Sequence, residues 1–164
     1  MAKHADKHAE KKTNAMRELD TSGQPYQAHW FECPEALSGV EVAHLLKEDP
    51  DCVFKTLVTV GKSGDHYVFM IPVALELDLK KAAAVVGEKA ISMVKSKELL
   101  GLTGYVHGGC SPLGMKKRFV TTIDESAALY ETIFFSGGKI GCQIETSLDA
   151  LKAVLPVGEA DLTA

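Results

Sequence analysis

The sequence has no long apolar run and no excess of positive charge. No stretch approaches the roughly 20 apolar residues that a membrane-spanning helix needs, and residues 1–13 lack the apolar core of a signal peptide. We therefore expect a soluble, cytoplasmic protein without a membrane partner. The 18 Lys and Arg residues and 22 Asp and Glu residues give a formal net charge of −4. This charge argues against a protein that binds long nucleic acid through its overall electrostatic field.

Cysteine is also sparse, and the four residues, Cys33, Cys52, Cys110 and Cys142, are scattered. The chain has no C-x-x-C pair and no Cys/His spacing typical of zinc, so we expect reduced thiols and no metal centre. Cys110 could act as a thiol nucleophile with His107 as its base. A small buried side chain is the commoner fate of cysteine, and no further His/Asn or His/Asp partner is apparent.

The 164 residues are enough for one domain with a sizeable core. Residues 1–12 form a polar N-terminal extension, and residues 13–164 would form the domain. Helical signals alternate with apolar runs joined by tight turns, which indicates a single α+β domain with a mixed sheet and helices around it. Helices are expected over residues 13–20, 38–48, 79–86, 96–100, 124–129 and 146–155, and strands over 26–31, 53–60, 66–71, 119–123, 132–135 and 140–145.

Capping residues define several of these ends. Ser38 and Glu41 have the spacing of a capping box, in which each side chain satisfies the backbone N–H of the other. Ser96 is expected to cap the helix that follows it, and Gly101 to stop that helix.

The strand over residues 53–60 is apolar on both faces, which is typical of a central strand. Lys55 shares one face with Val53, Leu57 and Thr59. An ammonium group there is costly unless it opens into a pocket or meets an acid. Lys55 is therefore the leading site candidate, and the alternative is a lysine that pairs with a nearby carboxylate or extends its stem to water.

A glycine-dense loop covers residues 104–114. The tandem Gly108-Gly109 lets the backbone approach a ligand closely, so that consecutive N–H groups can converge on an anion or a developing oxyanion. The Walker spacing is absent, and the alternative is a loop that only turns the chain. A second Gly-Gly turn, Gly137-Gly138, is one that a hairpin would need in any case.

Lys116, Lys117 and Arg118 follow the glycine loop directly. Three cations beside such a loop could contact phosphates. The alternative is a solvated strand edge that resists aggregation.

Several motifs, in order, resemble the YbaK/EbsC family of aminoacyl-tRNA deacylases, and most of all its branch that acts on Cys-tRNA(Pro). The resemblance runs from about residue 26 to residue 155, and its motifs are Phe54-Lys55-Thr56-Leu57, Leu79-Lys80-Lys81-Ala82-Ala83, Gly104-Tyr105, Gly108-Gly109, Ser111-Pro112-Leu113-Gly114, Glu131-Thr132-Ile133 and Ser136-Gly137-Gly138-Lys139. It implies a mixed, partly closed β-sheet surrounded by helices, as in the editing domain inserted in bacterial prolyl-tRNA synthetases.

The resemblance also implies an activity, which is removal of cysteine wrongly attached to tRNA(Pro). The partner would be the acceptor end of an aminoacyl-tRNA, commonly in company with prolyl-tRNA synthetase, and no metal or other cofactor would be needed. We favour a monomer. In the family the thiol of the substrate is thought to attack its own ester carbonyl, so that the protein supplies binding and orientation. A deacylase for another small aminoacyl-tRNA, such as Ala-tRNA(Pro), and a non-catalytic module that binds tRNA ends or a synthetase are the alternatives.

By the same resemblance, Lys55 matches the essential lysine of the family. Thr56 and Ser136 would help line the pocket, and the backbone of Gly108 and Gly109 would face the substrate carbonyl or ribose. Three further residues are assigned to substrate binding, and these are Phe31, Ser111 and Gly137. Phe31 takes a place where the family often has tyrosine, so the choice of amino acid is the least constrained part of the expectation.

Overall fold

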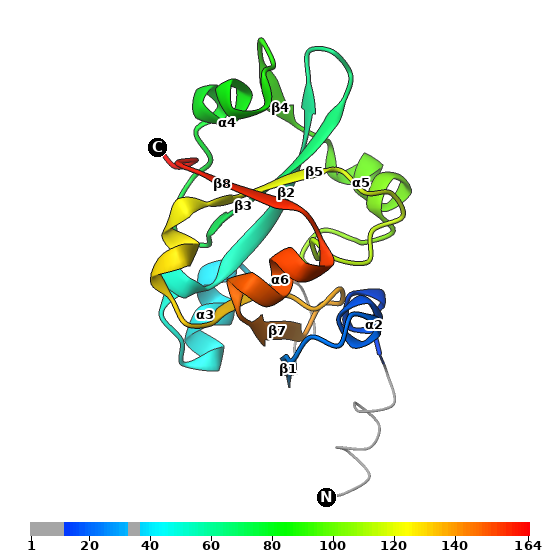
Figure 1. Cartoon of the computed structure of the whole chain (residues 1–164), viewed down its shortest axis with the longest axis vertical. Coiled ribbons are helices and arrows are strands. Elements are labelled where there is room, and N and C mark those ends of the chain that lie inside the picture. Colours follow the sequence, from blue (N-terminus) through cyan, green and yellow to red (C-terminus); the bar gives the residue numbers. More distant parts are fainter. Residues whose placement is uncertain (1–11, 33–36) are drawn as a thin grey trace, which may run out of the picture.

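The computed structural model describes residues 12–32 and 37–164 (Figure 1). The expected N-terminal extension and Cys33 therefore lie outside the described residues, apart from Lys12. The helices are α2 (Asn14–Thr21), α3 (Gly39–Leu46), α4 (Leu79–Val86), α5 (Ser96–Thr103) and α6 (Leu148–Val154), with short 3₁₀ turns η1 (Pro50–Cys52) and η2 (Glu125–Leu129). The strands are β1 (Gln27–Trp30), β2 (Phe54–Gly61), β3 (His66–Pro72), β4 (Ile91–Met93), β5 (Val120–Asp124), β6 (Ile133–Ser136), β7 (Cys142–Thr146) and β8 (Val157–Ala160).

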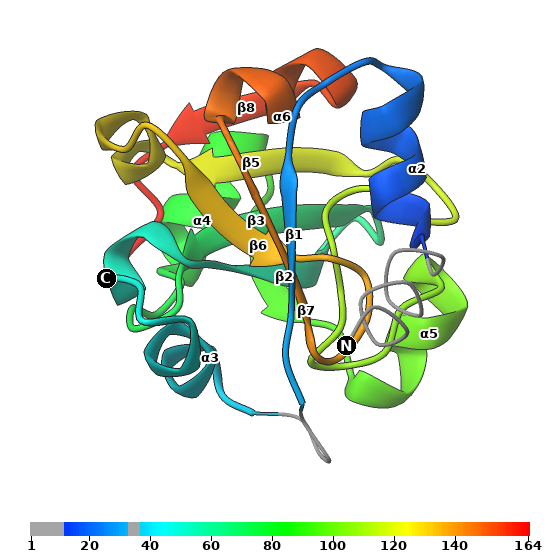
Figure 2. The ribbon, with the colours of Figure 1, turned by 90° about the horizontal axis from the view of Figure 1, so that it is seen from below.

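The strands form two sheets. The larger has the order β4-β2-β3-β5-β8 and the smaller has the order β1-β7-β6. Strands β2 and β3 form an antiparallel hairpin, whereas β3–β5 and β5–β8 pair in parallel, so the expected mixed sheet is confirmed. Figure 2 shows the small sheet running across the large one. A bridge from Val53 to Phe134 connects the two sheets at the start of β2.

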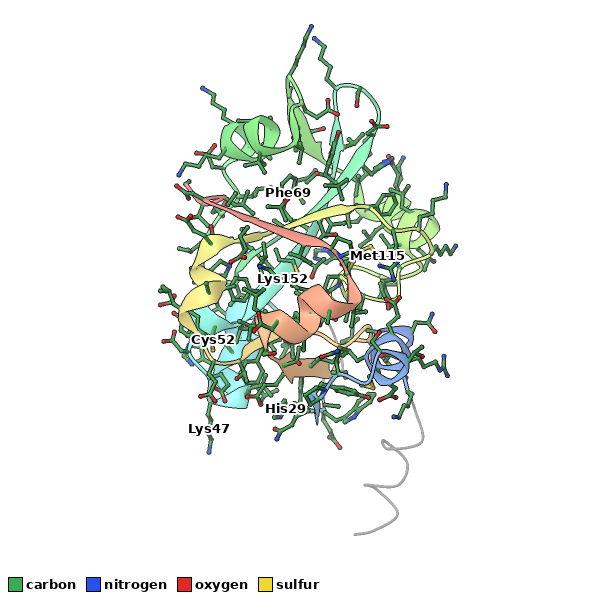
Figure 3. All side chains as sticks on the ribbon, viewed as in Figure 1. His29, Lys47, Cys52, Phe69, Met115 and Lys152 are labelled. Atoms are coloured by element: carbon green, nitrogen blue, oxygen red, sulfur yellow. The ribbon has the colours of Figure 1, made fainter. Side chains whose placement is uncertain are left out.

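Strand β3 is the centre of the core because both of its faces are covered. Met70 packs with residues of the small sheet, including Phe135 and Ile144, in the space between the two sheets. Phe69 packs on the other side with Ala82 of α4 and Ile91 of β4, beneath the α4 layer in Figure 3. No helix within the described parts of the chain is both long and apolar enough to span a bilayer.

The capping box at the start of α3 is confirmed. The Ser38 Oγ accepts the Glu41 N–H at 3.2 Å, and the Glu41 carboxylate accepts the Ser38 N–H at 3.0 Å. These hydrogen bonds depend only on residues three apart, so a local pattern was sufficient to predict them.

The prediction for α5 was wrong at both ends. Lys95 occupies the N-cap position without a side-chain hydrogen bond, and Ser96 is the first helical residue. The helix continues through Gly101 and ends at Gly104, which has φ +85°. A glycine inside a helix costs only about 1 kcal/mol, whereas the positive φ that ends the helix favours a glycine.

Two strands were not predicted. Strand β4 has only three residues and pairs with the end of β2, and β8 adds to the outer edge of β5 in parallel. The β8 sequence Val-Gly-Glu-Ala has weak strand propensity. Both are therefore formed by pairing with a neighbouring strand, which a local pattern does not reveal.

Candidate functional site

A pocket of about 360 Å³ opens beside the first half of β2. Its wall comprises the start of α3, residues 53–58 of β2, the β4–α5 segment, part of the glycine loop, and the facing ends of β6 and β7. The polar side chains that line it are Ser38, Lys55, Thr56, Ser96, His107, Ser136 and Gln143.

The pocket exists because β4 covers only part of the edge of β2. The pairing between β4 and β2 runs from Thr59 to Gly61, and the Val94 N–H then donates to the Val58 carbonyl at 3.2 Å. Over residues 55–57, β2 has no strand neighbour on that edge within the described chain. Side chains from several other elements surround this gap and leave it open.

Lys55 lies in this gap and is half-buried. Among the residues that the structure describes, its ammonium group has no hydrogen-bond or ion-pair partner, and no described residue lining the pocket is an Asp or Glu. The alternative in which Lys55 pairs with an internal acid therefore does not hold for the described part of the protein. An ammonium group left unpaired in a pocket is available to an anionic or carbonyl ligand.

Two further pocket atoms have no partner. The Thr56 Oγ1 and the Gln143 Oε1 are buried and make no hydrogen bond to any described residue. Leaving a buried polar atom unpaired costs about 1–3 kcal/mol, so both atoms are suited to hydrogen bonds from a bound ligand. Ser136 also lines the pocket, and its hydroxyl accepts the Gly138 N–H at 3.2 Å.

The glycine loop contributes less backbone to the pocket than the sequence suggested. Gly108 lines the pocket and is exposed, with φ +88°. The Gly109 N–H donates to the Val106 carbonyl at 3.0 Å, so this amide already has a partner. A Cβ at Gly109 would lie 3.0 Å from the Ile140 N, which makes this glycine a close-packing residue between two turns. His107 also lines the pocket.

Besides Gly109, three residues that the resemblance assigned to substrate binding do not line the pocket. Ser111 is fully buried, and its hydroxyl accepts the Leu113 N–H. Gly137 is buried against Cys142, and Phe31 donates its N–H to the Gly141 carbonyl at 2.9 Å. In the structure all three support the loops around the pocket.

The triplet of residues 116–118 lies apart from the pocket, beside a separate cavity of about 210 Å³. Arg118 donates to the Val154 carbonyl at 3.1 Å and to the Glu18 carboxylate at 3.4 Å. The Lys116 stem lies over Gly104 at the end of α5. The structure therefore does not bring this triplet to Lys55.

Cys110 lines the pocket, but burial raises the pKa of its thiol to about 11. Burial also raises the pKa of Cys52, and it raises the pKa of Cys142 to about 12. A nucleophilic cysteine requires a lowered pKa, so these thiols lack the chemistry of a nucleophile. In the described ranges, no three His, Cys, Asp or Glu side chains are grouped so that they could share a metal ion.

Sequence reasoning missed the contributions of Ser96 and Gln143 to the pocket. The alternation along β7 does carry a signal for one of them. Cys142 and Ile144 are buried, whereas Gln143 between them faces the other way and is only half-buried. Nothing in the local sequence indicates that this face meets β2.

Comparisons with known proteins agree with this geometry. The sequence profile of a family described as "Aminoacyl-tRNA editing domain" matches residues 33–154. A relative from Enterococcus faecalis, provisionally named Cys-tRNA(Pro)/Cys-tRNA(Cys) deacylase EbsC, is 42% identical over 160 residues, which cover 97% of this chain and 98% of the relative.

Solved structures show the same fold. A protein provisionally titled a trans-editing enzyme for prolyl tRNA synthetase superposes with a TM-score of 0.82 at 25% identity, covering 92% of this chain and 95% of the other. The hypothetical protein APE2540 superposes with a TM-score of 0.84 at 20% identity over 93% of this chain and 100% of the other, and this match shows the fold alone.

Proposed function

Because the chain belongs to the aminoacyl-tRNA editing domain family, we propose that it is a deacylase that removes cysteine from mischarged tRNA(Pro). The observation that carries the proposal is the unpaired ammonium of Lys55 in a pocket without a described carboxylate. The pocket volume, about 360 Å³, lies within the range of small-ligand sites. It suits a terminal ribose and a small aminoacyl group.

The chemistry uses the thiol of the substrate. Its sulfur attacks the ester carbonyl carbon, the bond from that carbon to the ribose oxygen breaks, and the thiol proton passes to the ribose oxygen. The product is free tRNA and a four-membered thiolactone, which water opens to cysteine. This route needs no nucleophile from the protein, which fits a pocket whose own thiol, Cys110, has a pKa of about 11.

The role of the pocket is then to position and to stabilise charge. The Lys55 ammonium attracts the carbonyl oxygen as it gains negative charge, or holds the terminal nucleotide, and either contact favours the attacking geometry. The Thr56 and Gln143 oxygens, which have no partner among the described residues, can accept hydrogen bonds from the α-ammonium of the aminoacyl group. Gly108 allows the backbone to approach the ribose.

Prolyl-tRNA synthetase is the proposed partner. Support comes from the structural relative titled as a trans-editing enzyme for that synthetase. The formal net charge of −4 also fits a protein that reads only the end of the tRNA and leaves much of the affinity to a partner.

The test is a deacylation panel over Cys-, Ala-, Ser- and Pro-tRNA(Pro), with and without prolyl-tRNA synthetase. We expect Cys-tRNA(Pro) to react at least tenfold faster than the Ala and Ser forms, because only cysteine carries the thiol. Equal rates for Ala-tRNA(Pro) would favour the broader deacylase, and binding without turnover would favour a non-catalytic module. A synthetase effect on the rate would support the partner.

A further inference from the structure

We propose that the unpaired 3′ end of the tRNA docks on the α5 rim, defined as residues 93–97, with its phosphates on Lys95 and Lys97. The inference rests on the proposed function, since it takes the aminoacyl end of that strand to lie in the Lys55 pocket. It replaces the 116–118 triplet as the phosphate contact nearest to the pocket.

The α5 rim is part of the pocket wall. Met93, Val94 and Ser96 line the pocket, so Lys95 and Lys97 directly flank lining residues. Strand β4 fixes one end of the rim, because Met93 pairs with Thr59 of the Lys55 strand. Leu99, which is buried, fixes the other end. The two lysines are therefore held at a set position relative to Lys55.

The charges of the rim have no partner of their own. Lys95 and Lys97 are exposed, and within residues 12–32 and 37–164 neither forms an ion pair. In contrast, Lys81 pairs with Asp161 and Lys152 pairs with Glu159. Lysines that are free of internal carboxylates can neutralise phosphates without first breaking an ion pair.

The start of α5 reinforces the positive sign. Lys95 is the N-cap residue of α5, and its side chain satisfies none of the first N–H groups of the helix. The dipole of α5 also favours an anion at this end of the helix. Glu98 in the first turn is the opposing charge. The side chains of Lys95, Lys97 and Glu98 together retain one positive charge.

The chemistry points to a nucleic-acid strand. Phosphates precede the terminal nucleotide along the chain, so a strand whose last group enters the pocket carries its phosphates across the rim. Met93, which is 46% exposed and lines the pocket, adds an apolar surface for a base. Such phosphate contacts position a strand without reading its sequence, which suits a protein with an acidic overall charge.

The test compares the double variant Lys95→Ala/Lys97→Ala with Lys62→Ala/Lys80→Ala, which makes the same charge change at two other exposed lysines that form no ion pair with any described residue. Binding to non-acylated tRNA(Pro) and to a short single-stranded RNA ending in CCA is measured by fluorescence anisotropy over a range of salt concentrations. We expect the rim variant to bind about tenfold more weakly and to lose about 1.4 from the slope of log K against log salt, for two contacts on a single strand. The control variant should keep the wild-type slope.

Four further measurements sharpen the test. Glu98→Gln should bind about twofold more tightly, since it removes the opposing charge. Lys95→Arg/Lys97→Arg should restore affinity, and thermal unfolding should show both rim variants folded. With Cys-tRNA(Pro), the rim variant should raise KM and leave kcat within twofold of wild type.

Binding is measured on RNA that carries no amino acid. Absence of deacylation would therefore overturn the proposed function and leave this binding test intact. The inference is overturned if the rim variant and its control have the same affinity and the same salt slope.

Discussion

Two cationic regions of this protein are site candidates in the sequence and behave differently in the structure. One is Lys55 in β2, and the other is the triplet of residues 116–118. Lys55 lies in a pocket and has no carboxylate partner among the described residues. Arg118 is held by the Glu18 carboxylate and the Val154 carbonyl, and so ties α2 and α6 to the loop before β5.

The difference shows that a cation which already has internal partners acts as a structural group, whereas a cation without them is free to bind a ligand. A guanidinium that already donates to a carbonyl and a carboxylate contributes to the fold, and a phosphate would have to compete with both contacts. An ammonium in a cavity without an acid has no such competitor. Four substitutions test whether this comparison holds.

The largest effect is expected for Lys55→Ala. Removal of a preorganised charge that stabilises a transition state typically costs about 10²–10³ in rate, so we expect a loss of at least about 100-fold in kcat/KM for Cys-tRNA(Pro). Because the Lys55 ammonium has no hydrogen bond or ion pair with any described residue, the melting temperature should change little. Single-turnover deacylation and thermal unfolding measure the two quantities.

Lys81→Ala is the matched control for this variant. Lys81 is a half-buried lysine that lies outside the pocket and donates to Asp161 and to the Thr163 carbonyl, so its loss should leave kcat/KM within about twofold of wild type. Full activity in Lys55→Ala would show that Lys55 is not the binding group that the comparison takes it to be.

The second effect concerns the packing that shapes the pocket beside Lys55. A Cβ at Gly137 would lie 2.3 Å from the Cys142 Sγ, and overpacking of this kind costs about 1–3 kcal/mol. Gly137→Ala should therefore lower the free energy of unfolding by that amount in urea titrations. Gly101→Ala is the control, because nothing lies within 4 Å of its added Cβ, and it should raise stability by about 0.5–1 kcal/mol.

A double-mutant cycle identifies the cause of the Gly137 effect. Cys142→Ala removes the sulfur, so Gly137→Ala should cost clearly less in that background than in wild type. Equal costs in the two backgrounds would place the strain elsewhere.

The fold was predictable from sequence where its signals are local. The Ser38 capping box depends on residues three apart, and the β2–β3 hairpin joins two apolar runs through a short turn, so both were predicted correctly. The end of α5 was mistaken because Gly101 and Gly104 compete as the stop, and only the backbone shows which has positive φ. Strands β4 and β8 depend on their partners, which the local pattern does not contain.

The site was predictable where its residues belong to a recognisable motif, since Gly108 of the glycine loop and Ser136 at the end of β6 also line the pocket as expected. Lys55 and Thr56 are neighbours in β2, so a single motif identified both, and the structure places both at the pocket. Ser38, Ser96 and Gln143 come from three other elements, and their convergence follows from tertiary packing. Ser111 was misplaced for the same reason, since a motif gives no information on whether a hydroxyl faces a pocket or the core.

The third substitution addresses the second region of the comparison. Arg118→Ala removes the contacts to Glu18 and Val154, and an exposed ion pair of this kind contributes at most about 1 kcal/mol. We expect a small fall in melting temperature and unchanged affinity for tRNA. Lys117→Ala, at an exposed neighbour that forms no ion pair with a described residue, should change neither quantity. Weaker tRNA binding by Arg118→Ala at an unchanged melting temperature would instead support phosphate binding by residues 116–118.

The smallest effect is expected for Cys110→Ser, which removes the other reactive group of the pocket and leaves Lys55 in place. With a pKa of about 11, roughly one Cys110 in 10⁴ is thiolate at pH 7. Because the pKa is raised, the neutral thiol persists as pH increases, so its alkylation by iodoacetamide should rise about tenfold per pH unit between pH 7 and pH 10. A substrate thiol that attacks its own ester does not depend on this group, so kcat/KM should stay within twofold of wild type. Loss of turnover in a folded Cys110→Ser variant would indicate that Cys110, and not the substrate thiol, is the nucleophile. Lys55 would then act on a covalent intermediate.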